Sequence, residues 1–365
     1  MVDYITKGDT IIFSPEFNKS LDPELLSPYN KIIFTNYNLD DKLFDAYENN
    51  NFNNFNISYS RSCFNQPLYD SLDNLISLTH INFGFNFNQP LCNSLDNLIS
   101  LTHLSFSDYF KQPLYHSLDK LSSLTHLTFY YYCNFNQPLC HSLDNLSSLT
   151  HLTFGFYFNQ PLLNELDKLS SLTHLTFGFN FNQPLYHSLD KLISLTHLSF
   201  SESFNKPLSY SLDKLSSLTH LSFGESFNNP LLYSFDKLTS LTHIGLGNKF
   251  NQKHDLPFNI KSIKLNCNNQ YYINYLSDNI EEIEFGNQFN LELNNLPSSI
   301  KKISFDKYND YNNELNCLPN SVELLQLPYN YNLQIKNIPI GLKKIKCYKY
   351  YEFINDFIDV EIETY

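Results

Sequence analysis

The 365-residue chain contains no tryptophan, one methionine and only nine glycines. It has no apolar run of about 18 residues, so the sequence predicts no membrane-spanning helix. Its first residues, MVDYITKGDTIIF, lack the basic and apolar segments of a secretory signal. A P-loop and the G-x-G-x-x-G, G-x-S-x-G and H-E-x-x-H motifs are missing too. We therefore predict an intracellular protein that is not an enzyme and uses no cofactor.

The cysteine pattern and the scarcity of basic residues also exclude some kinds of site and partner. The seven cysteines form no C-x-x-C pair, and their odd number and irregular spacing fit neither a disulfide framework nor a zinc site. Free thiols indicate a reducing compartment, so we expect a cytoplasmic location. Lys and Arg number 24 against 37 Asp and Glu, a net charge of −13. Such a chain repels phosphate backbones and anionic membranes, so we expect neither as a partner.

What the sequence contains instead is an internal repeat. A Phe-Asn step, or Phe-Lys in one copy, recurs every 23 residues, with one spacing of 25 between Phe110 and Phe135. The repeated phenylalanines are Phe64, Phe87, Phe110, Phe135, Phe158, Phe181, Phe204, Phe227 and Phe250. A Leu-Thr-His step follows each of the first eight at a constant interval. Self-similarity at such a period is the mark of a solenoid, in which each coil is completed by its neighbours.

Within each copy two apolar periods are visible. In L-x-x-L-x-F, Leu175 and Phe177 alternate with polar residues, which predicts a short strand with one buried face. Upstream, Leu118, Leu121 and Leu124 recur every three residues, which favours a 3₁₀ turn, with Asp119 as its cap. Twenty-three residues are too few for a strand and a full helix. We predict an α/β repeat solenoid, a leucine-rich-repeat-like horseshoe with one parallel sheet on the concave face and short 3₁₀ or irregular segments on the convex face.

The repeat boundaries predict one continuous solenoid with four parts. These are divergent N-terminal repeats or a cap (1–60), eight regular 23-residue repeats (61–250), divergent L-P-x-x-I repeats of 20–22 residues (251–350), and a C-terminal cap or tail (351–365). In the N-terminal part, Ile11/Phe13 and Ile32/Phe34 are predicted rungs, and a third near Ile57/Tyr59 has an open register.

The L-P-x-x-I repeats carry an independent sign of stacking. One position in successive copies alternates in charge: Lys261, Glu281, Lys301, Glu323 and Lys343. Opposite charges on neighbouring strands attract and like charges repel, so this alternation predicts parallel rungs in register.

The combination of Phe-Asn-x-Pro-Leu with Leu-x-x-Leu-Thr-His-Leu-x-Phe resembles the FNIP repeat family of social amoebae and giant DNA viruses of amoebae, which is related to leucine-rich repeats. The resemblance is closest from Phe64 to Asn251, although Gln66 and its equivalents stand where the family name has Ile. It implies an interaction scaffold without catalytic residues. Some viral members look like substrate receptors of a cullin-type ubiquitin ligase with an N-terminal F-box. The only comparable segment here is residues 20–34, where Pro28 would break a helix and Ile32/Phe34 fit a repeat strand better.

The Leu-Thr-His histidines are the first candidate site. They are His80, His103, His126, His151, His174, His197, His220 and His243, all predicted to face the concave side. Three interpretations stand: a structural ladder copied by duplication, part of a protein-binding face, or a metal site. A metal needs further ligands, and only Asp108, Glu202 and Glu225 are near in the sequence pattern. Because neighbouring imidazolium ions repel, we also expect stability to fall below about pH 6.5.

The one lengthened repeat supplies the second candidate. Its extra residues lie at Tyr130, Tyr131 and Tyr132, and insertions in solenoids often lie on a binding edge. The leading prediction is a monomeric, non-enzymatic scaffold that binds a protein partner on its concave face. The F-box receptor and the metal-binding solenoid are the alternatives.

Overall fold

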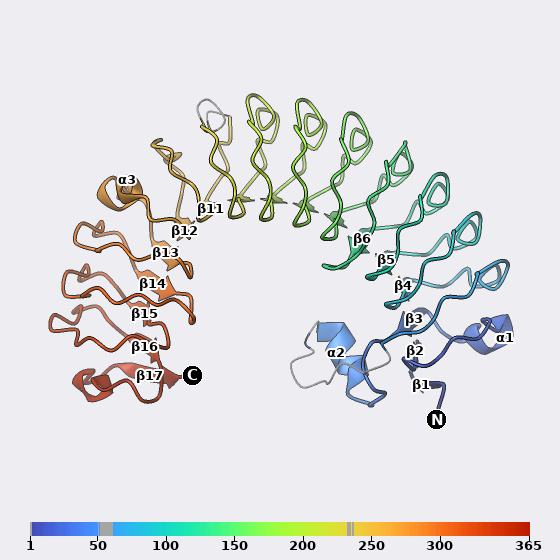
Figure 1. Ribbon diagram of the computed structural model, residues 1–365, viewed down its shortest axis with the longest axis horizontal. Helices are drawn as coiled ribbons and strands as arrows, with labels where there is room; N and C mark the ends of the chain where they lie inside the picture. The colour runs from blue at the N-terminus through green and yellow to red at the C-terminus, as the bar shows by residue number, and fades with distance from the viewer. Residues whose placement is uncertain (1, 50, 52–60, 232–234, 236) are drawn as a thin grey trace. The chain divides into compact units, whose positions relative to one another are not determined.

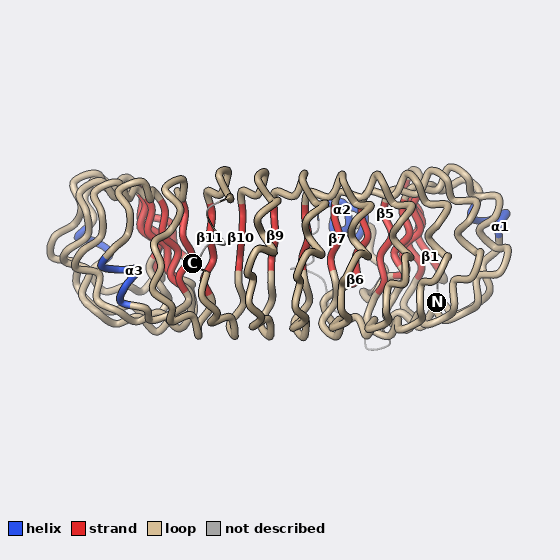
Figure 2. Tube along the Cα trace, turned by 90° about the horizontal axis from the view of Figure 1, so that it is seen from above, coloured by secondary structure: helices blue, strands red, loops and turns tan. Residues whose placement is uncertain are grey.

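The computed structural model describes residues 2–49, 51, 61–231, 235 and 237–365. The chain forms two compact units, unit 1 (Met1–Leu195) and unit 2 (Thr196–Tyr365). Each unit is a coil of short strands joined by turns, as Figures 1 and 2 show. None of the described helices is long and apolar enough to cross a membrane.

Unit 1 has a sheet whose strands follow the chain order. The strands are β1 (Tyr4–Lys7), β2 (Thr10–Phe13), β3 (Lys31–Phe34), β4 (His80–Asn82), β5 (His103–Phe106), β6 (His126–Phe129), β7 (His151–Thr153) and β8 (His174–Thr176). β1 pairs antiparallel with β2, and from β2 to β8 each strand pairs in parallel with the next. Two short helices, α1 (Pro23–Leu26) and α2 (Leu43–Asn49), lie between the first strands.

Unit 2 continues the same design with parallel strands. They are β9 (His197–Ser199), β10 (His220–Ser222), β11 (His243–Leu246), β12 (Ser262–Leu265), β13 (Glu282–Phe285), β14 (Lys302–Phe305), β15 (Leu324–Gln326), β16 (Lys344–Cys347) and β17 (Glu361–Thr364). Each pairs with the next in register. Helix α3 (Gln270–Asn274) and the 3₁₀ helix η1 (Ile354–Asp356) are the other described elements.

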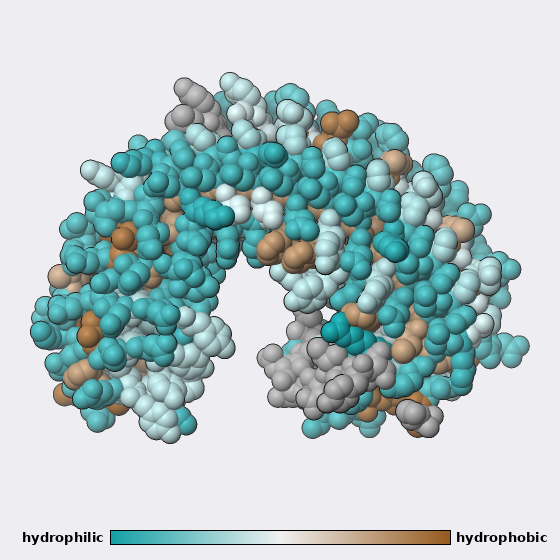
Figure 3. All heavy atoms as spheres, in the orientation of Figure 1, coloured by the Kyte–Doolittle hydropathy of each residue, from teal (hydrophilic) through white to brown (hydrophobic). Residues whose placement is uncertain are grey.

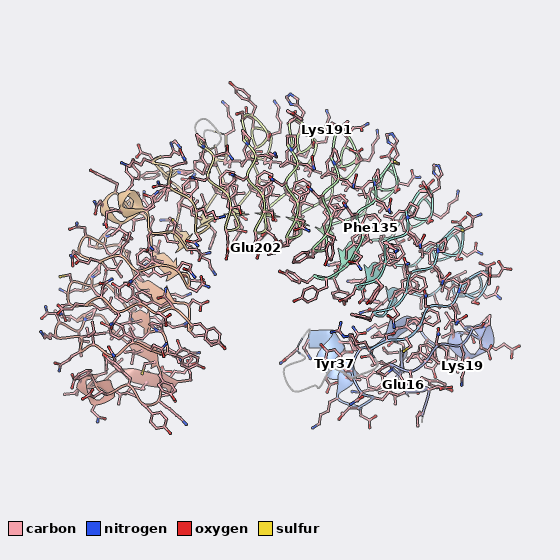
Figure 4. All side chains as sticks on the ribbon, viewed as in Figure 1. Glu16, Lys19, Tyr37, Phe135, Lys191 and Glu202 are labelled. Carbon is pink, nitrogen blue, oxygen red and sulfur yellow. The ribbon has the colours of Figure 1, made fainter. Side chains whose placement is uncertain are left out.

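The two apolar periods behave as predicted. In β6, Leu127 and Phe129 are buried while the alternate residues are partly exposed. On the turn side, the Leu121 N–H donates to the Leu118 carbonyl and the Leu124 N–H to the Leu121 carbonyl, both at 3.0 Å, the i to i+3 pattern of a 3₁₀ turn. Figure 4 shows Phe135 inside its coil and Lys191 pointing away from the strands. The core of each unit therefore lies between its strands and its turns, as in leucine-rich-repeat solenoids.

The Phe-Asn step locks one coil to the next. Phe135 stacks on the equivalent phenylalanines before and after it, with ring centroids 6.1 Å apart in each case. The Asn65 side-chain oxygen accepts the backbone N–H of Asn88 at 2.9 Å and the side-chain amide of Gln89 at 3.1 Å. The glutamine that stands where the FNIP repeat has Ile is thus part of the ladder, a role that the sequence did not reveal.

Lys111 interrupts this asparagine ladder. Its backbone N–H still donates to the Asn88 side chain at 3.1 Å. The next glutamine, Gln137, donates to the Lys111 carbonyl at 3.1 Å, but lysine offers no side-chain oxygen to accept a further bond. The interruption falls in the copy that carries the extra tyrosines.

The predicted in-register stacking of charges is confirmed in unit 2. Glu281 lies between two lysines and pairs with Lys261 at 3.4 Å and Lys301 at 2.8 Å. Lys343 pairs with Glu323 at 2.6 Å in the same series. Opposite charges on successive rungs thus lie in one column, with ion pairs inside the Lys261–Glu281–Lys301 and Glu323–Lys343 groups.

Near the N-terminus the structure departs from a simple series of rungs. The predicted rungs Ile11/Phe13 and Ile32/Phe34 are strands β2 and β3, but Ile57 and Tyr59 lie outside the described residues. β3 pairs directly with β4, which places Lys31 opposite His80. The chain between them contains α2, which packs on the strand face away from the turns (Figure 1).

Helix α2 explains an irregularity in the first strands. Ile12 and Ile33 stand where later strands carry partly exposed polar residues, yet both are buried. Leu43 and Phe44 of α2 cover them, with Tyr47 packed alongside. The signal in the sequence was the runs TIIF and KIIF, whose strands are apolar on both faces.

Candidate functional site

Unit 1 carries five of the eight predicted histidines in one column. His80, His103, His126, His151 and His174 occupy paired positions on β4 to β8. Successive imidazole rings are 4.1–4.2 Å apart between centroids and are inclined by 10–11°. The rings are therefore stacked face to face, each half-buried by its neighbours, and their edges point away from the sheet.

Unit 2 carries the other three histidines in a column of its own. His220 stacks on His197 at 4.1 Å and on His243 at 3.9 Å. The predicted alignment of equivalent histidines is thus present within each unit, because parallel strands in register place equal positions side by side.

The threonine before each histidine fixes the tautomer of the imidazole. The Thr102 hydroxyl donates its single proton to the Thr79 carbonyl on the preceding rung, at 3.0 Å. It lies 2.9 Å from His103 Nδ1, so in that contact the threonine oxygen can only accept and Nδ1 must carry the proton. The same pair of contacts recurs at His80, His126, His151 and His174. In each neutral ring the lone pair is therefore on Nε2, the outer nitrogen.

Burial lowers the pKa of four of these rings and so keeps them uncharged at neutral pH. Burial, followed by the positive charge of Lys31, lowers the pKa of His80 to about 4. Burial and then the neighbouring imidazoles lower the pKa of His103 to about 4 as well. Burial is also the main reason that the pKa values of His126 and His174 are lowered. Burial, rather than repulsion between rings, is thus the main cause of the predicted shift.

A cavity lies at the β3 end of this column. Its volume is about 610 Å³, within the usual range of ligand pockets. His80, His103 and His126 form part of its floor. Its walls come from three other elements: Lys7–Thr10 of the first hairpin, Phe44, Tyr47 and Glu48 of α2, and Tyr130. The sequence did not reveal this cavity, because α2 and the hairpin lie outside the repeats.

The three predicted tyrosines are separated by the fold. Tyr130 turns back along the strand face, and its hydroxyl accepts a hydrogen bond from Asn82 at 2.9 Å. The residue as a whole is 40% exposed, but burial raises the pKa of its phenol. Tyr131 and Tyr132 are more exposed and pack against Phe156, with centroids 5.6 and 6.2 Å away. Tyr130 therefore belongs to the cavity, and the other two form an aromatic edge.

The alternative sites receive no such geometry. The part of the chain that the structure describes contains no group of three His, Cys, Asp or Glu side chains placed to hold a metal ion, so Asp108, Glu202 and Glu225 complete no such site. Asp119, the predicted cap, and its equivalents Asp144 and Asp190 instead each contact a histidine three residues earlier, at 2.9–3.1 Å. Residues 20–34 form the single-turn helix α1 and then strand β3, as a repeat coil would.

Comparisons with known proteins agree with this architecture. A family model described as the FNIP repeat matches residues 268–308, within the L-P-x-x-I repeats. No curated protein matches the chain.

Solved structures extend the likeness to the whole fold. The chain is similar to CroV588, a circular leucine-rich-repeat protein of a giant virus, with 27% identity and a TM-score of 0.59 over 96% of this chain and 58% of that one. It is also similar to TLR13 in its complex with ssRNA13 (16% identity, TM-score 0.55, 80% and 51% covered) and to the Toll–Spätzle complex of Drosophila (16%, 0.52, 77% and 44%). The chain thus spans 44–58% of these proteins' lengths. The chain thus contains a segment that matches the FNIP repeat, and it has the fold of leucine-rich-repeat proteins.

Proposed function

We propose that the protein is a non-enzymatic scaffold that binds another protein through the strand face of unit 1, centred on the histidine column. The observation that carries the proposal is the row of outward Nε2 atoms on five stacked imidazoles, held by hydrogen bonds to the threonines beneath them. A surface of this kind is rigid before it meets a partner, so binding costs little further ordering.

The surroundings of the column support a specific contact surface. The cavity beside it offers a concave end, and Tyr130 supplies a partly exposed aromatic ring of the type enriched at interface centres. Figure 3, which views the coils from the side, shows a mainly hydrophilic surface there. Two of the similar structures, the Toll–Spätzle and TLR13–RNA complexes, are leucine-rich-repeat proteins with bound macromolecules. The net charge of −13 favours a protein over a nucleic acid here.

The test is affinity capture followed by direct binding. The wild-type chain is compared with a His103→Phe/His126→Phe double variant, which keeps flat rings in the stack but removes the outer nitrogens. The matched control is Tyr186→Ser, which alters a side chain that is 64% exposed on the turn side. We expect a partner that binds the wild type and the control and is lost from the double variant.

A purified partner is then titrated against all three proteins, whose thermal midpoints show that they are folded. Equal binding to the double variant and the wild type would contradict a role for this face. Loss of binding only in the turn-side control would move the interface to the convex face.

A further inference from the structure

The cavity of unit 1 has a definite electrostatic character. Because Nδ1 carries the proton, each neutral ring directs the negative end of its dipole outward, toward Nε2. The Nε2 atoms of His80, His103 and His126 make no hydrogen bond with any residue that the structure describes. Stacked at 4.1 Å, these parallel rings add their fields, so the floor of the cavity accepts hydrogen bonds and donates none through these nitrogens.

The charged residues around the floor add to this character. Asp9 of the hairpin and Glu48 of α2 bring two carboxylates to the wall. Of the two lysines there, Lys7 is paired with Asp45 at 3.0 Å. Lys31 stands opposite His80 at one end of the column and has no ion pair with any described carboxylate. Lys31 therefore disfavours a second cation most strongly beside His80 and less so toward His126.

We infer that this cavity takes the side chain of an arginine from a basic segment of the partner, with the guanidinium across His103 and His126, between Glu48 and the Tyr130 ring. A guanidinium has five N–H donors in one plane and no acceptor, which matches a floor of acceptors. Its planar face also stacks on aromatic rings such as Tyr130. The net charge of −13 attracts a basic partner over a longer range. This inference rests on the proposed function and names the chemistry of its partner.

Lys31 sets the direction of the bound segment. Its ammonium is the free donor at the β3 end of the cavity among the described residues, and it attracts a carbonyl or carboxylate oxygen. The arginine side chain therefore extends from the Lys31 end toward His126, with its main-chain oxygens beside Lys31.

The experiment measures binding of three fluorescein-labelled peptides to the full chain near neutral pH: acetyl-Gly-Arg-Gly-Arg-Gly-amide and the same peptide with lysine or with glutamate in place of arginine. We expect the arginine peptide to bind best, the lysine peptide less well and the glutamate peptide not at all. His103→Phe and Glu48→Gln each weaken arginine-peptide binding about tenfold or more. His220→Phe is the matched control, because that ring has the same threonine contact and stacking but lies outside the cavity.

Imidazole nitrogen NMR supplies a second readout that does not depend on the variants. In the wild type, Nε2 of His103 is unprotonated, and its resonance shifts when the arginine peptide is added. Tighter binding of the glutamate peptide, or arginine-peptide binding that His103→Phe and Glu48→Gln leave unchanged, overturns the inference. If a captured partner still requires His103 while no arginine peptide binds, the inference fails and the scaffold function stands. If the partner requires neither, the proposed function fails as well.

Discussion

Rungs are joined in two different ways in the histidine region of unit 1 and the β12–β16 region of unit 2. In the first, the outward residues are uncharged: stacked imidazoles, threonine hydroxyls and the Asn-Gln amides. In the second, the equivalent positions carry Lys264 paired with Glu284, and Lys302 paired with Glu282 at 3.0 Å. The cores beneath are alike in both regions, with strand residues such as Leu127 and Ile303 fully buried.

This difference shows that the core and the outer face of a rung have separate requirements. The core needs only apolar residues of period two. On the outer face, side chains on adjacent rungs must attract one another, and either hydrogen bonds or alternating charges provide that attraction. The two solutions respond differently to acid and to salt, which gives ways to test them.

The largest expected difference is in the response to pH. The pKa values of His80 and His103, about 4 when folded, lie below the ordinary value of 6.5. As the pH falls below 6.5, the unfolded chain takes up these protons first, so the stability that the neutral column contributes is lost progressively toward pH 4. Hydrogen-bonded ion pairs with lysine lower the pKa of Glu281 and of Glu323 below the ordinary 4.5, so these charged pairs weaken only at lower pH.

The thermal midpoint of the chain, followed by circular dichroism, checks this order. It should fall between about pH 7 and 5, before the carboxylates titrate. His103→Phe, which cannot take up a proton, should make the fall shallower. A midpoint that is constant over this range would contradict the burial of neutral imidazoles.

A smaller effect is expected from the threonine beneath one ring. Thr102→Val removes the bond to the Thr79 carbonyl and leaves the His103 Nδ1–H without its acceptor. Leaving a partly buried donor unpaired costs about 1–3 kcal/mol of unfolding free energy, measured by urea denaturation. Thr102→Ser keeps the hydroxyl and serves as the control. A Thr102→Val variant as stable as the wild type would contradict this contribution of the hydrogen bonds.

Repairing the asparagine ladder should give a modest gain. Lys111→Asn supplies a side-chain oxygen that can accept the side-chain amide of Gln137, as Asn65 accepts that of Gln89. We expect the unfolding free energy to rise by about 0.5–1 kcal/mol. Lys111→Gln removes the same charge but places its amide one methylene further from the backbone, so a gain of equal size there would point to charge alone.

The smallest effect is expected in the charged columns. Glu281→Gln removes the partner of Lys261 and Lys301, at a site exposed to solvent. Surface pairs contribute little and are screened by salt. The thermal midpoint should drop slightly at low salt and match the wild type in about 1 M NaCl. Glu352→Gln, at an exposed residue without an ion pair among the described residues, is the control, and a drop of equal size there would remove the role of pairing.

Most of the fold could be predicted from the sequence because the sequence repeats. Leu175 and Phe177 predict a strand because the same alternation recurs at a fixed period, and Glu281 between two lysines predicts register because its neighbours are known from the repeat. The histidine column follows from the same logic. Its tautomer does not, because that depends on where the Thr102 hydroxyl points once the preceding rung is in place.

The unrepeated segments could not be predicted in this way. Helix α2 is seven residues long and shows no period of its own, so its position over Ile12 and Ile33 follows only from the assembled strands. The cavity could not be predicted from the sequence either, because α2 forms one of its walls. Tyr130 differs in structure from the two tyrosines that follow it because side chains on earlier rungs, Asn82 and Ser105, bind its hydroxyl. The predicted four-part division of the chain stays a prediction.

The hydrogen bonds of the threonine column all run in one direction, each hydroxyl donating to the rung before it and leaving its own carbonyl for the rung after. Each coil is therefore a cassette, a unit whose donors match the coil before it and whose acceptors match the coil after it. Duplicating or deleting a whole cassette by unequal recombination would leave every donor with an acceptor. The length of the histidine column, and with it the reach of the surface, can therefore change in single genetic steps without redesign of the fold.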